Sequence, residues 1–513
     1  MQKSNKHPNI IHLHPDDQVV VAFRDLSKGE KVLDVTLTED IMHWHKVAIK
    51  PIPAQTPVLK YGEEIGYATQ DIAPGQWVHS HNLATGKVLE LEDHELATAV
   101  PPDPEPITDR YFLGYRSPEG RAATRNYILL ASTVDCANHA LDMALRELNR
   151  DRDALLRRYP NVDGILGLTH ESGCGLASGS EGHQRQNRTI NGFLTHPNAA
   201  ACLVVGLGCE KSRPELIYGS DPLAKEGSPK RKTPLTYMIQ DEGGTQAAVD
   251  KIVAFVHEQL PLINRRRREL IPASELIMAT QCGGSNGLSG ITSNPAIGVA
   301  SDMLVACGGA SFLAELTETV GAGHLLTRRA KTVEIAKKYL TIVAWWQQYL
   351  EKHGASFEDN TTPGNRRGGL TTVAEKALGS SVKSGTAALS GVIEYAEPIP
   401  GPGLYFMNSP GYDPASTTGQ TASGALVGVF STGQGSCFGG TLIPWIKVVS
   451  NSEVYERLPD MEINAGALVE GVPLETIGRQ IFEQVLATAS GAKTYSEKMD
   501  ITVFNVWNTG VTT

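Results

Sequence analysis

The sequence lacks any uninterrupted apolar run of the roughly 20 residues that a helix needs to cross a bilayer. Its N-terminal stretch, MQKSNKHPN, is polar and does not resemble a signal peptide. We therefore expect a cytoplasmic protein with no membrane partner. Its seven cysteines are then expected to be reduced thiols rather than a disulfide framework.

Basic residues are also fewer than acidic residues. The chain has 46 Lys and Arg against 56 Asp and Glu, a net charge of −10 with His neutral. Nucleic-acid binding needs a basic surface, so nucleic acid is not an expected partner. There is no Cys-x-x-Cys spacing, Walker loop or dinucleotide fingerprint, which argues against a structural zinc site and a nucleotide-binding loop. The length of 513 residues predicts about two to four globular domains.

Histidine, by contrast, is concentrated near the N-terminus. Three His-x-His pairs occur there, His12/His14, His43/His45 and His79/His81. Side chains two apart in a strand share a face, so each pair can present two imidazoles together. The pattern predicts metal ligands or proton-transfer groups, with chance accumulation on the surface as the alternative.

Four segments are distinguished by their patterns. Short apolar runs broken by Pro and Gly predict a small β-rich domain over residues 1–92. The Pro-rich stretch 93–110 predicts a linker. Apolar strands alternate with helical segments in 111–272 and again in 273–513. The expected fold class is therefore α/β, with a small N-terminal β-rich domain followed by two α/β domains that have mainly parallel sheets.

Several of the predicted strands end in Gly-rich turns that carry cysteine. Cys174 lies in HESGCG together with His170, Cys209 lies in GLGCE, and Cys282 lies in QCGGSNG. Ligands of parallel sheets bind beyond the carboxyl ends of the strands. These thiols are suited to metal ligation or catalysis, and simple core packing is an equally good interpretation of each one alone.

Further polar turns suit a hydroxylated acid. Ser285 formally matches a hydrolase elbow, but a turn that cradles a ligand through Ser285 and Asn286 is the favoured interpretation. Positively charged side chains in Gly-rich turns are suited to binding the carboxylate of a substrate. The alternative interpretation is a basic loop that is simply exposed to solvent. The residues concerned are Asn365, Arg366, Arg367 and Lys383.

Two acidic residues follow an apolar segment in the string AELTE. Glu315 and Glu318 are candidates for a base or a ligand, and a capped helix start is the competing interpretation.

Taken together, these strings resemble the altronate/galactarate dehydratase family. The strings include HPDDQVV, HWHKVAI, HESGCG, GLGCEK, QCGGSNGLSGITSNPA, TTPGNRRGGL and EINAG, and they extend over nearly the whole chain. His14 and Asp17 match the family's His-x-x-Asp pattern, and His45-Lys46 matches its His-Lys pair. His79-x-His81 is similar to altronate-type members, whereas TTPGNRRGGL and VKSG are more similar to galactarate-type members.

The resemblance implies a sugar-acid hydro-lyase with an N-terminal domain of the SAF type. It predicts dehydration of galactarate or D-altronate to a 2-keto-3-deoxy acid by a homo-oligomer, expected to be a dimer. The expected reaction is metal-assisted removal of the C2 proton with loss of the C3 hydroxyl, and the expected catalytic residues are His14, His45, Lys46 and His170. It also implies Fe(II) or Mn(II), and the thiols leave open an iron–sulfur cluster. The expected metal ligands are His79, His81, Cys174, Cys209 and Cys282. The alternatives are a sulfo-lyase on the same scaffold and an inactive sugar-acid-binding protein.

Overall fold

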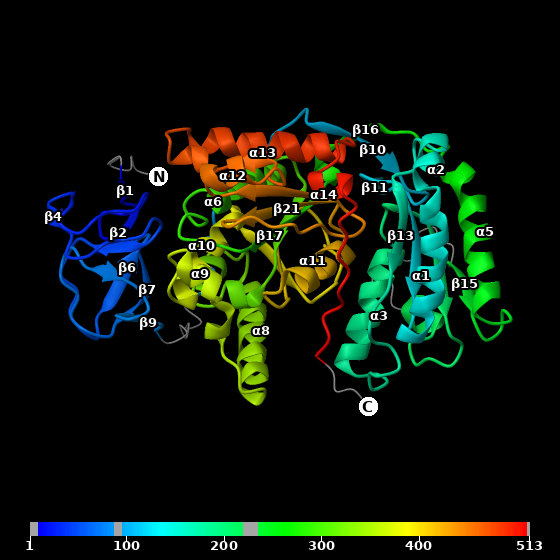
Figure 1. Cartoon of the computed structure of the whole chain (residues 1–513), viewed down its shortest axis with the longest axis horizontal. Coiled ribbons are helices and arrows are strands. Elements are labelled where there is room, and N and C mark those ends of the chain that lie inside the picture. Colours follow the sequence, from blue (N-terminus) through cyan, green and yellow to red (C-terminus); the bar gives the residue numbers. More distant parts are fainter. Residues whose placement is uncertain (1–8, 87–94, 219–233, 510–513) are drawn as a thin grey trace.

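The computed structural model describes residues 9–86, 95–218 and 234–509. Three bodies lie in a row (Figure 1): the N-terminal β-rich domain at one end, the second α/β domain in the middle and the first α/β domain at the other end. This arrangement confirms the expected fold class. In the part of the chain that is described, no helix is long and apolar enough to span a membrane.

The N-terminal domain is built from small antiparallel sheets. One has the order β1-β2-β5-β8 and another the order β6-β7-β9, beside a two-stranded hairpin, β3-β4. The strands are β1 (Ile10–Ile11), β2 (Val19–Ala22), β3 (Lys31–Val32), β4 (Val35–Thr36), β5 (Lys46–Ala48), β6 (Pro57–Lys60), β7 (Glu63–Ala68), β8 (Trp77–Val78) and β9 (Leu83–Ala84). Lys46 is opposite Val78 in the antiparallel pair, so the preceding His45 and the following His79 become neighbours.

A small antiparallel sheet lies at the junction of the two α/β domains. Its strands are β10 (Tyr111–Arg116), β11 (Ala122–Ala123) and β16 (Glu269–Pro272), in the order β11-β10-β16. The first α/β domain has a parallel sheet in the order β13-β12-β14-β15. Its elements are β12 (Tyr127–Ser132), α1 (Asp135–Arg150), α2 (Arg152–Arg158), β13 (Gly164–Leu168), α3 (Glu181–Leu194), β14 (Ala199–Gly206), α4 (Pro214–Tyr218), β15 (Leu235–Met238) and α5 (Thr245–Ile263).

The second α/β domain has a seven-stranded parallel sheet in the order β19-β20-β18-β17-β21-β22-β23. Its strands are β17 (Ile277–Gly283), β18 (Ala310–Leu313), β19 (Leu389–Ile393), β20 (Gly403–Met407), β21 (Val427–Thr432), β22 (Trp445–Val449) and β23 (Ile463–Asn464). Its helices are α6 (Ser293–Ala306), α7 (His324–Thr327), α8 (Val333–Lys352), α9 (Pro363–Arg367), α10 (Val373–Ser381), α11 (Asp413–Ala422), α12 (Ser452–Arg457), α13 (Leu474–Ala489) and α14 (Tyr495–Lys498). Apolar residues of α6 and α13 share one core cluster with the sheet, and those of α8 share another.

Helix α10 connects the N-terminal domain to the second α/β domain. Ala377 and Leu378 of this helix are buried in the same hydrophobic cluster as Val58 and Ile65 of the N-terminal domain. The Thr372 hydroxyl, at the start of α10, also donates a hydrogen bond to the Ile65 carbonyl. Burial of apolar surface on both sides therefore fixes the N-terminal domain beside the loops that follow the central strands.

Candidate active site

The paired histidines of the N-terminal domain hold helix α9. The rings of His45 and His79 are stacked with their centroids 5.0 Å apart. Nε2 of His45 donates to the Arg367 carbonyl at 3.1 Å, and Nε2 of His79 donates to the Arg366 carbonyl at 3.0 Å. These carbonyls are at the C-terminal end of a short helix, where backbone acceptors lack partners within the helix.

Both imidazoles are neutral in this arrangement. Burial lowers the pKa of His45, and burial together with the Lys46 charge lowers the pKa of His79 to about 4. Nδ1 of His45 accepts a hydrogen bond from Nε1 of Trp77 at 3.0 Å, and Nδ1 of His79 lies 2.9 Å from the Ser80 hydroxyl. Both nitrogens of each ring are thus engaged, so these histidines position α9.

An ion triad crosses the same interface. Nζ of Lys46 donates to Oε2 of Glu375 at 2.8 Å, and Nζ of Lys60 donates to Oε1 of the same carboxylate at 2.8 Å. Burial lowers the pKa of Lys46 to about 8, although Glu375 opposes this shift. The charges of the two lysines outweigh the burial of Glu375 and keep its pKa well below the usual value. Lys46, which we predicted to be catalytic, therefore forms a buried ion pair in this structure.

The loop after β17 is also hydrogen-bonded to helix α9. The Asn365 amide donates to the Ser285 carbonyl at 2.8 Å, and the Asn286 amide donates to the Gly433 carbonyl at 3.1 Å. The Asn286 side-chain oxygen accepts from the backbone N–H of Leu288 at 3.1 Å. The structure thus brings together Ser285, Asn286 and Asn365, which we predicted to bind substrate, beside the helix that His45 and His79 hold.

A buried ionisable cluster occupies the carboxyl edge of the central strands. Nζ of Lys383 donates to Sγ of Cys282 at 3.1 Å and to the Ser380 hydroxyl at 2.6 Å. Oε2 of Glu315 lies 3.7 Å from the Lys383 ammonium. Burial raises the Cys282 pKa to about 12, so this residue is a thiol, and burial raises the Glu315 pKa well above its usual value.

A second carboxylate–lysine pair lies next to this one. Nζ of Lys376 and Oε1 of Glu318 are 2.7 Å apart, and Glu318 is also 3.9 Å from the Cys282 thiol. Burial raises the pKa of nearby Asp413 to about 6, and its carboxylate accepts a hydrogen bond from the Gln281 amide at 2.8 Å. Two carboxyls with different environments in one site are the usual arrangement for acid–base chemistry.

His14 and Asp17 shape the turn before β7. Asp17 accepts hydrogen bonds from the backbone N–H groups of Tyr61 and Gly62 at 3.1 and 2.8 Å. The His14 ring lies against Gly62, where a Cβ atom would approach within 3.0 Å of it, and φ at this glycine is +75°. The His-x-x-Asp pattern therefore fixes this turn, which leads into β7 at Glu63.

Comparison with known proteins gives matches over three segments. Residues 8–86 match the SAF domain of altronate/galactarate dehydratases, residues 114–264 match the second domain of D-galactarate dehydratase/altronate hydrolase, and residues 273–512 match the C-terminal domain of D-galactarate/altronate dehydratase. The chain is 38% identical to galactarate dehydratase (L-threo-forming) of Escherichia coli, over 96% of each chain. It is 33% identical to altronate dehydratase of Bacillus subtilis, over 98% of this chain and 99% of that one.

The chain belongs to the galactarate/altronate dehydratase family. This finding confirms the resemblance that the motifs indicated and identifies the protein as a hydro-lyase. A further relative is the β subunit of (2R)-sulfolactate sulfo-lyase of Chromohalobacter salexigens, which is 29% identical over 77% of this chain and 96% of that subunit.

The metal ligands predicted for this dehydratase are distributed over all three domains. His79 and His81 are in the N-terminal domain, Cys174 and Cys209 follow β13 and β14 of the first α/β domain, and Cys282 is in the second. Among the residues that the structure describes, no three His, Cys, Asp or Glu side chains are grouped so that they could hold a metal ion. The predicted set therefore does not fit a single metal site.

His170 also lies outside the cluster. It follows β13, and Nε2 donates to the Ser132 carbonyl at 3.2 Å. Burial lowers its pKa to about 4. His170 thus stabilises the loop at the carboxyl edge of the first sheet, in a different domain from Lys383 and Glu315.

Two predicted cations remain available to a ligand. Arg366 is half-buried and Arg367 is exposed, and neither guanidinium forms a hydrogen bond or ion pair with the described residues. Their hydrogen bonds to the described residues are made by backbone groups, which include the carbonyls that accept from the two histidines. Lys383, which we predicted to bind substrate with them, instead lies inside the buried cluster.

Sequence analysis missed Lys60, Glu375 and Lys376. All three are buried and charged, and each finds its partner in a distant part of the sequence. For Glu375 and Lys376 the available signal was the string VAEKALG, in which two charges interrupt an otherwise apolar helix. Such charges are expected to be paired when the helix is buried.

Proposed function

We propose that the protein dehydrates a six-carbon sugar acid, galactarate or D-altronate, to a 2-keto-3-deoxy acid. The observation that carries this proposal is the buried pair of carboxyls, Glu315 and Glu318, each beside a lysine at the carboxyl edge of the central strands. Relatives over nearly the full chain are named galactarate and altronate dehydratases, which supports this class of substrate.

The reaction requires a base, an acid and a stabiliser of negative charge. The C2 proton is removed from beside a carboxylate, which gives an enediolate. The C3–O bond then breaks, and the hydroxyl leaves as water after it has gained a proton. The resulting enol becomes the keto acid by gaining a proton at C3 and losing one from the C2 hydroxyl.

The two carboxyls are suited to opposite roles. Glu318 is paired with the Lys376 ammonium, so it is the carboxylate that accepts the C2 proton. Glu315 has a raised pKa and therefore keeps a proton, which it donates to the leaving hydroxyl. The ammonium groups of Lys376 and Lys383 stabilise the enediolate charge in a site removed from water.

Fe(II) or Mn(II) remains a prediction from the family resemblance, and the iron–sulfur cluster remains a possibility that only the cysteines left open. Such a metal would act as a Lewis acid on the substrate oxygens. We assign no step to it, because no group of described side chains fits it. Oligomerisation likewise stays a prediction.

Of the two sugar acids, galactarate is favoured. Identity to galactarate dehydratase is 38%, against 33% and 31% for two altronate dehydratases. The side chains of Arg366 and Arg367, which have no partner among the described residues, are suitable partners for the C1 carboxylate that both acids carry.

A sulfo-lyase is the second candidate, supported by the relative of that name. Both activities begin with removal of the proton at C2, and they differ in the group that leaves from C3. A binding protein without activity is disfavoured, because a purely binding role does not need a buried acid–base pair.

The test is a screen of hexarates and hexonates with the purified protein, anaerobically and with iron or manganese. Formation of a 2-keto-3-deoxy acid from galactarate or D-altronate is the expected result. Release of sulfite from sulfolactate, without keto-acid formation from sugar acids, would instead support the sulfo-lyase. Binding without turnover of any of these compounds would support the binding protein.

A further inference from the structure

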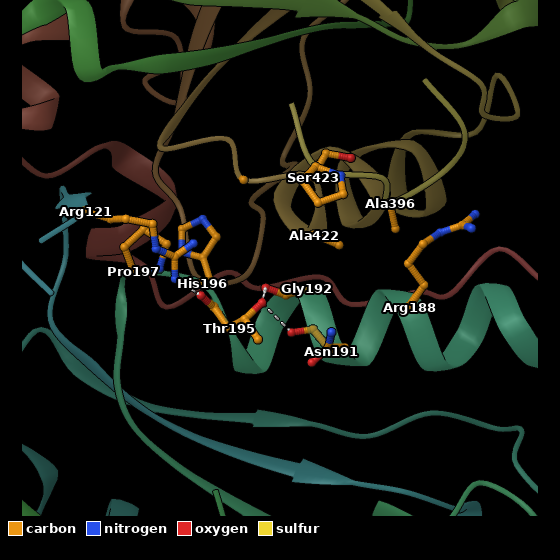
Figure 2. Close-up of a pocket in the computed structure, with 12 residues that line it drawn as sticks. Arg121, Arg188, Asn191, Gly192, Thr195, His196, Pro197, Ala396, Ala422 and Ser423 are labelled. Atoms are coloured by element: carbon orange, nitrogen blue, oxygen red, sulfur yellow. Dashed lines mark hydrogen bonds between the residues drawn. The ribbon is translucent and has the colours of Figure 1, made fainter. Parts of the chain in front are cut away.

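Two described cavities lie at domain boundaries. The first, of about 40 Å³, lies between the two α/β domains. Thr195 at the end of α3 lines it, together with Ala422 and Ser423 of the second α/β domain (Figure 2). This space holds little more than a water molecule. The second, of about 230 Å³, lies between the N-terminal domain and helix α10. It is smaller than the roughly 300–1,000 Å³ of drug-sized pockets, and it suits a compact ligand.

The larger cavity has donors on one wall. Helix α10 begins there, and the first-turn amides of Val373 and Ala374 have no acceptor within the helix. Arg328 lines the same cavity, and its guanidinium can only donate hydrogen bonds. His324 also lines it, is only 5% exposed, and has an Nδ1 atom without a hydrogen-bond partner among the described residues.

The opposite wall carries acceptors from the N-terminal domain. Glu63 and Glu64 of β7 line the cavity. Nε2 of His324 is 3.2 Å from Glu63, and this hydrogen bond lowers the Glu63 pKa, so the carboxylate is charged. The Glu64 carboxylate accepts a hydrogen bond from the Tyr67 hydroxyl at 3.2 Å. Carboxylate oxygens only accept hydrogen bonds, so they recognise ligand hydroxyls.

We propose that this cavity binds the distal end of the sugar acid. Glu63 and Glu64 accept hydrogen bonds from its hydroxyls, while Arg328 and the first turn of α10 bind a distal carboxylate. The inference rests on the proposed function and adds the subsite that distinguishes a hexarate from a hexonate. A hexonate ends in a neutral hydroxymethyl group, which gains less from Arg328.

The position of the cavity along the chain supports this assignment. Its walls include Val320 and Gly321, which follow Glu318, and Val373 and Ala374, which precede Lys376. The same two segments thus carry both the cavity and the proposed base with its lysine. The N-terminal domain supplies the remaining wall, which explains how a domain without the acid–base pair contributes to substrate binding.

The test is calorimetric titration of galactarate and D-altronate into full-length protein carrying Lys383→Met, so that turnover does not contribute heat. Adding Arg328→Met should weaken galactarate binding about 10-fold or more and D-altronate binding much less. Adding Ala374→Leu, which fills the cavity with a good helix former, should weaken binding of both. The control is Lys331→Met, an exposed cation three residues away that lies 3.6 Å from Asp103.

Unchanged affinity for both acids in the Arg328→Met and Ala374→Leu proteins would overturn the inference. An equal effect of Lys331→Met and Arg328→Met would also overturn it, because general surface charge would then be responsible. The proposed function is judged separately, by turnover of the wild-type protein. If the wild-type protein shows no turnover but the variants change affinity as expected, the subsite stands and the proposed reaction fails.

Discussion

Lys46 of the N-terminal domain and Glu375 of helix α10 form an ion pair at 2.8 Å, with both side chains fully buried. The two residues are 329 positions apart in the sequence. Lys60 binds the other oxygen of the same carboxylate, so one negative charge serves two ammonium groups. This contact fixes the N-terminal domain against the helix that also carries Lys376.

Glu375→Gln should destabilise the protein strongly. The change leaves two buried lysines without their counter-charge, and breaking a buried pair from one side typically costs about 3–5 kcal/mol. Urea unfolding measures the effect. Glu475→Gln, at an exposed position in the first turn of α13, is the matched control and should change the free energy of unfolding by less than about 0.5 kcal/mol. Similar free energies of unfolding for the two variants would show that the ion triad does not stabilise the folded protein.

Glu315→Gln and Glu318→Gln should each lower kcat by about 100- to 10,000-fold. The first change removes the proposed acid, and the second removes the proposed base. Thermal melting should show that both variants stay folded. The exposed residue Glu456 of α12 lies outside the cluster, so Glu456→Gln should keep normal kcat. A kcat within a few-fold of wild type in either cluster variant would refute the role assigned to that residue.

Asp413 should make stability depend on pH. Burial raises its pKa from 3.8 to about 6, so the folded state binds more protons than the unfolded state between these values. Its contribution to stability is therefore lost as the pH rises through this interval. The Asp413→Asn variant has no carboxyl at this position, so it does not lose this stability. Between about pH 4 and pH 7, the free energy of unfolding of the variant should rise relative to that of the wild type by up to about 3 kcal/mol. A pH-independent difference would contradict the assignment.

Arg366→Met should reduce kcat/KM for galactarate and D-altronate equally. If Arg328 takes the distal carboxylate, the side chain of Arg366 is left for the C1 carboxylate, which both acids share. Loss of a charge-assisted contact predicts a decrease of about 10- to 100-fold. Steady-state kinetics on both acids measure it, with Lys352→Met at the end of α8 as the control. A decrease restricted to galactarate would place the distal carboxylate at Arg366 instead.

Chelation tests the expected metal. If activity depends on Fe(II) or Mn(II), treatment with a chelator should abolish turnover, and adding either ion should restore it. Anaerobic metal analysis of the purified protein gives the stoichiometry. Full activity in metal-free protein would assign stabilisation of the enediolate to Lys376 and Lys383 alone.

The sequence by itself determined the fold class and the family. Unbroken apolar strands alternating with helices reflect burial on both faces of a parallel sheet, and this pattern is local. The Gly-rich strings are also local, and they indicated the turns that hold Ser285, Asn286 and Asn365. The His-x-His spacing predicted that the two imidazoles of each pair lie together, but the stacked pair in the structure is His45 with His79, which come from two different His-x-His pairs.

Only the tertiary structure decided which groups meet. Cys282 was grouped with Cys174 and Cys209 as a possible metal ligand, yet the fold places it beside Lys383 and Glu315. Lys46 was predicted to be catalytic, but the structure pairs it with Glu375 of α10, 329 positions away in the chain. The physical reason is that burial and pairing set the charge states of these side chains. Both depend on neighbours that the fold supplies and that spacing along the chain does not encode.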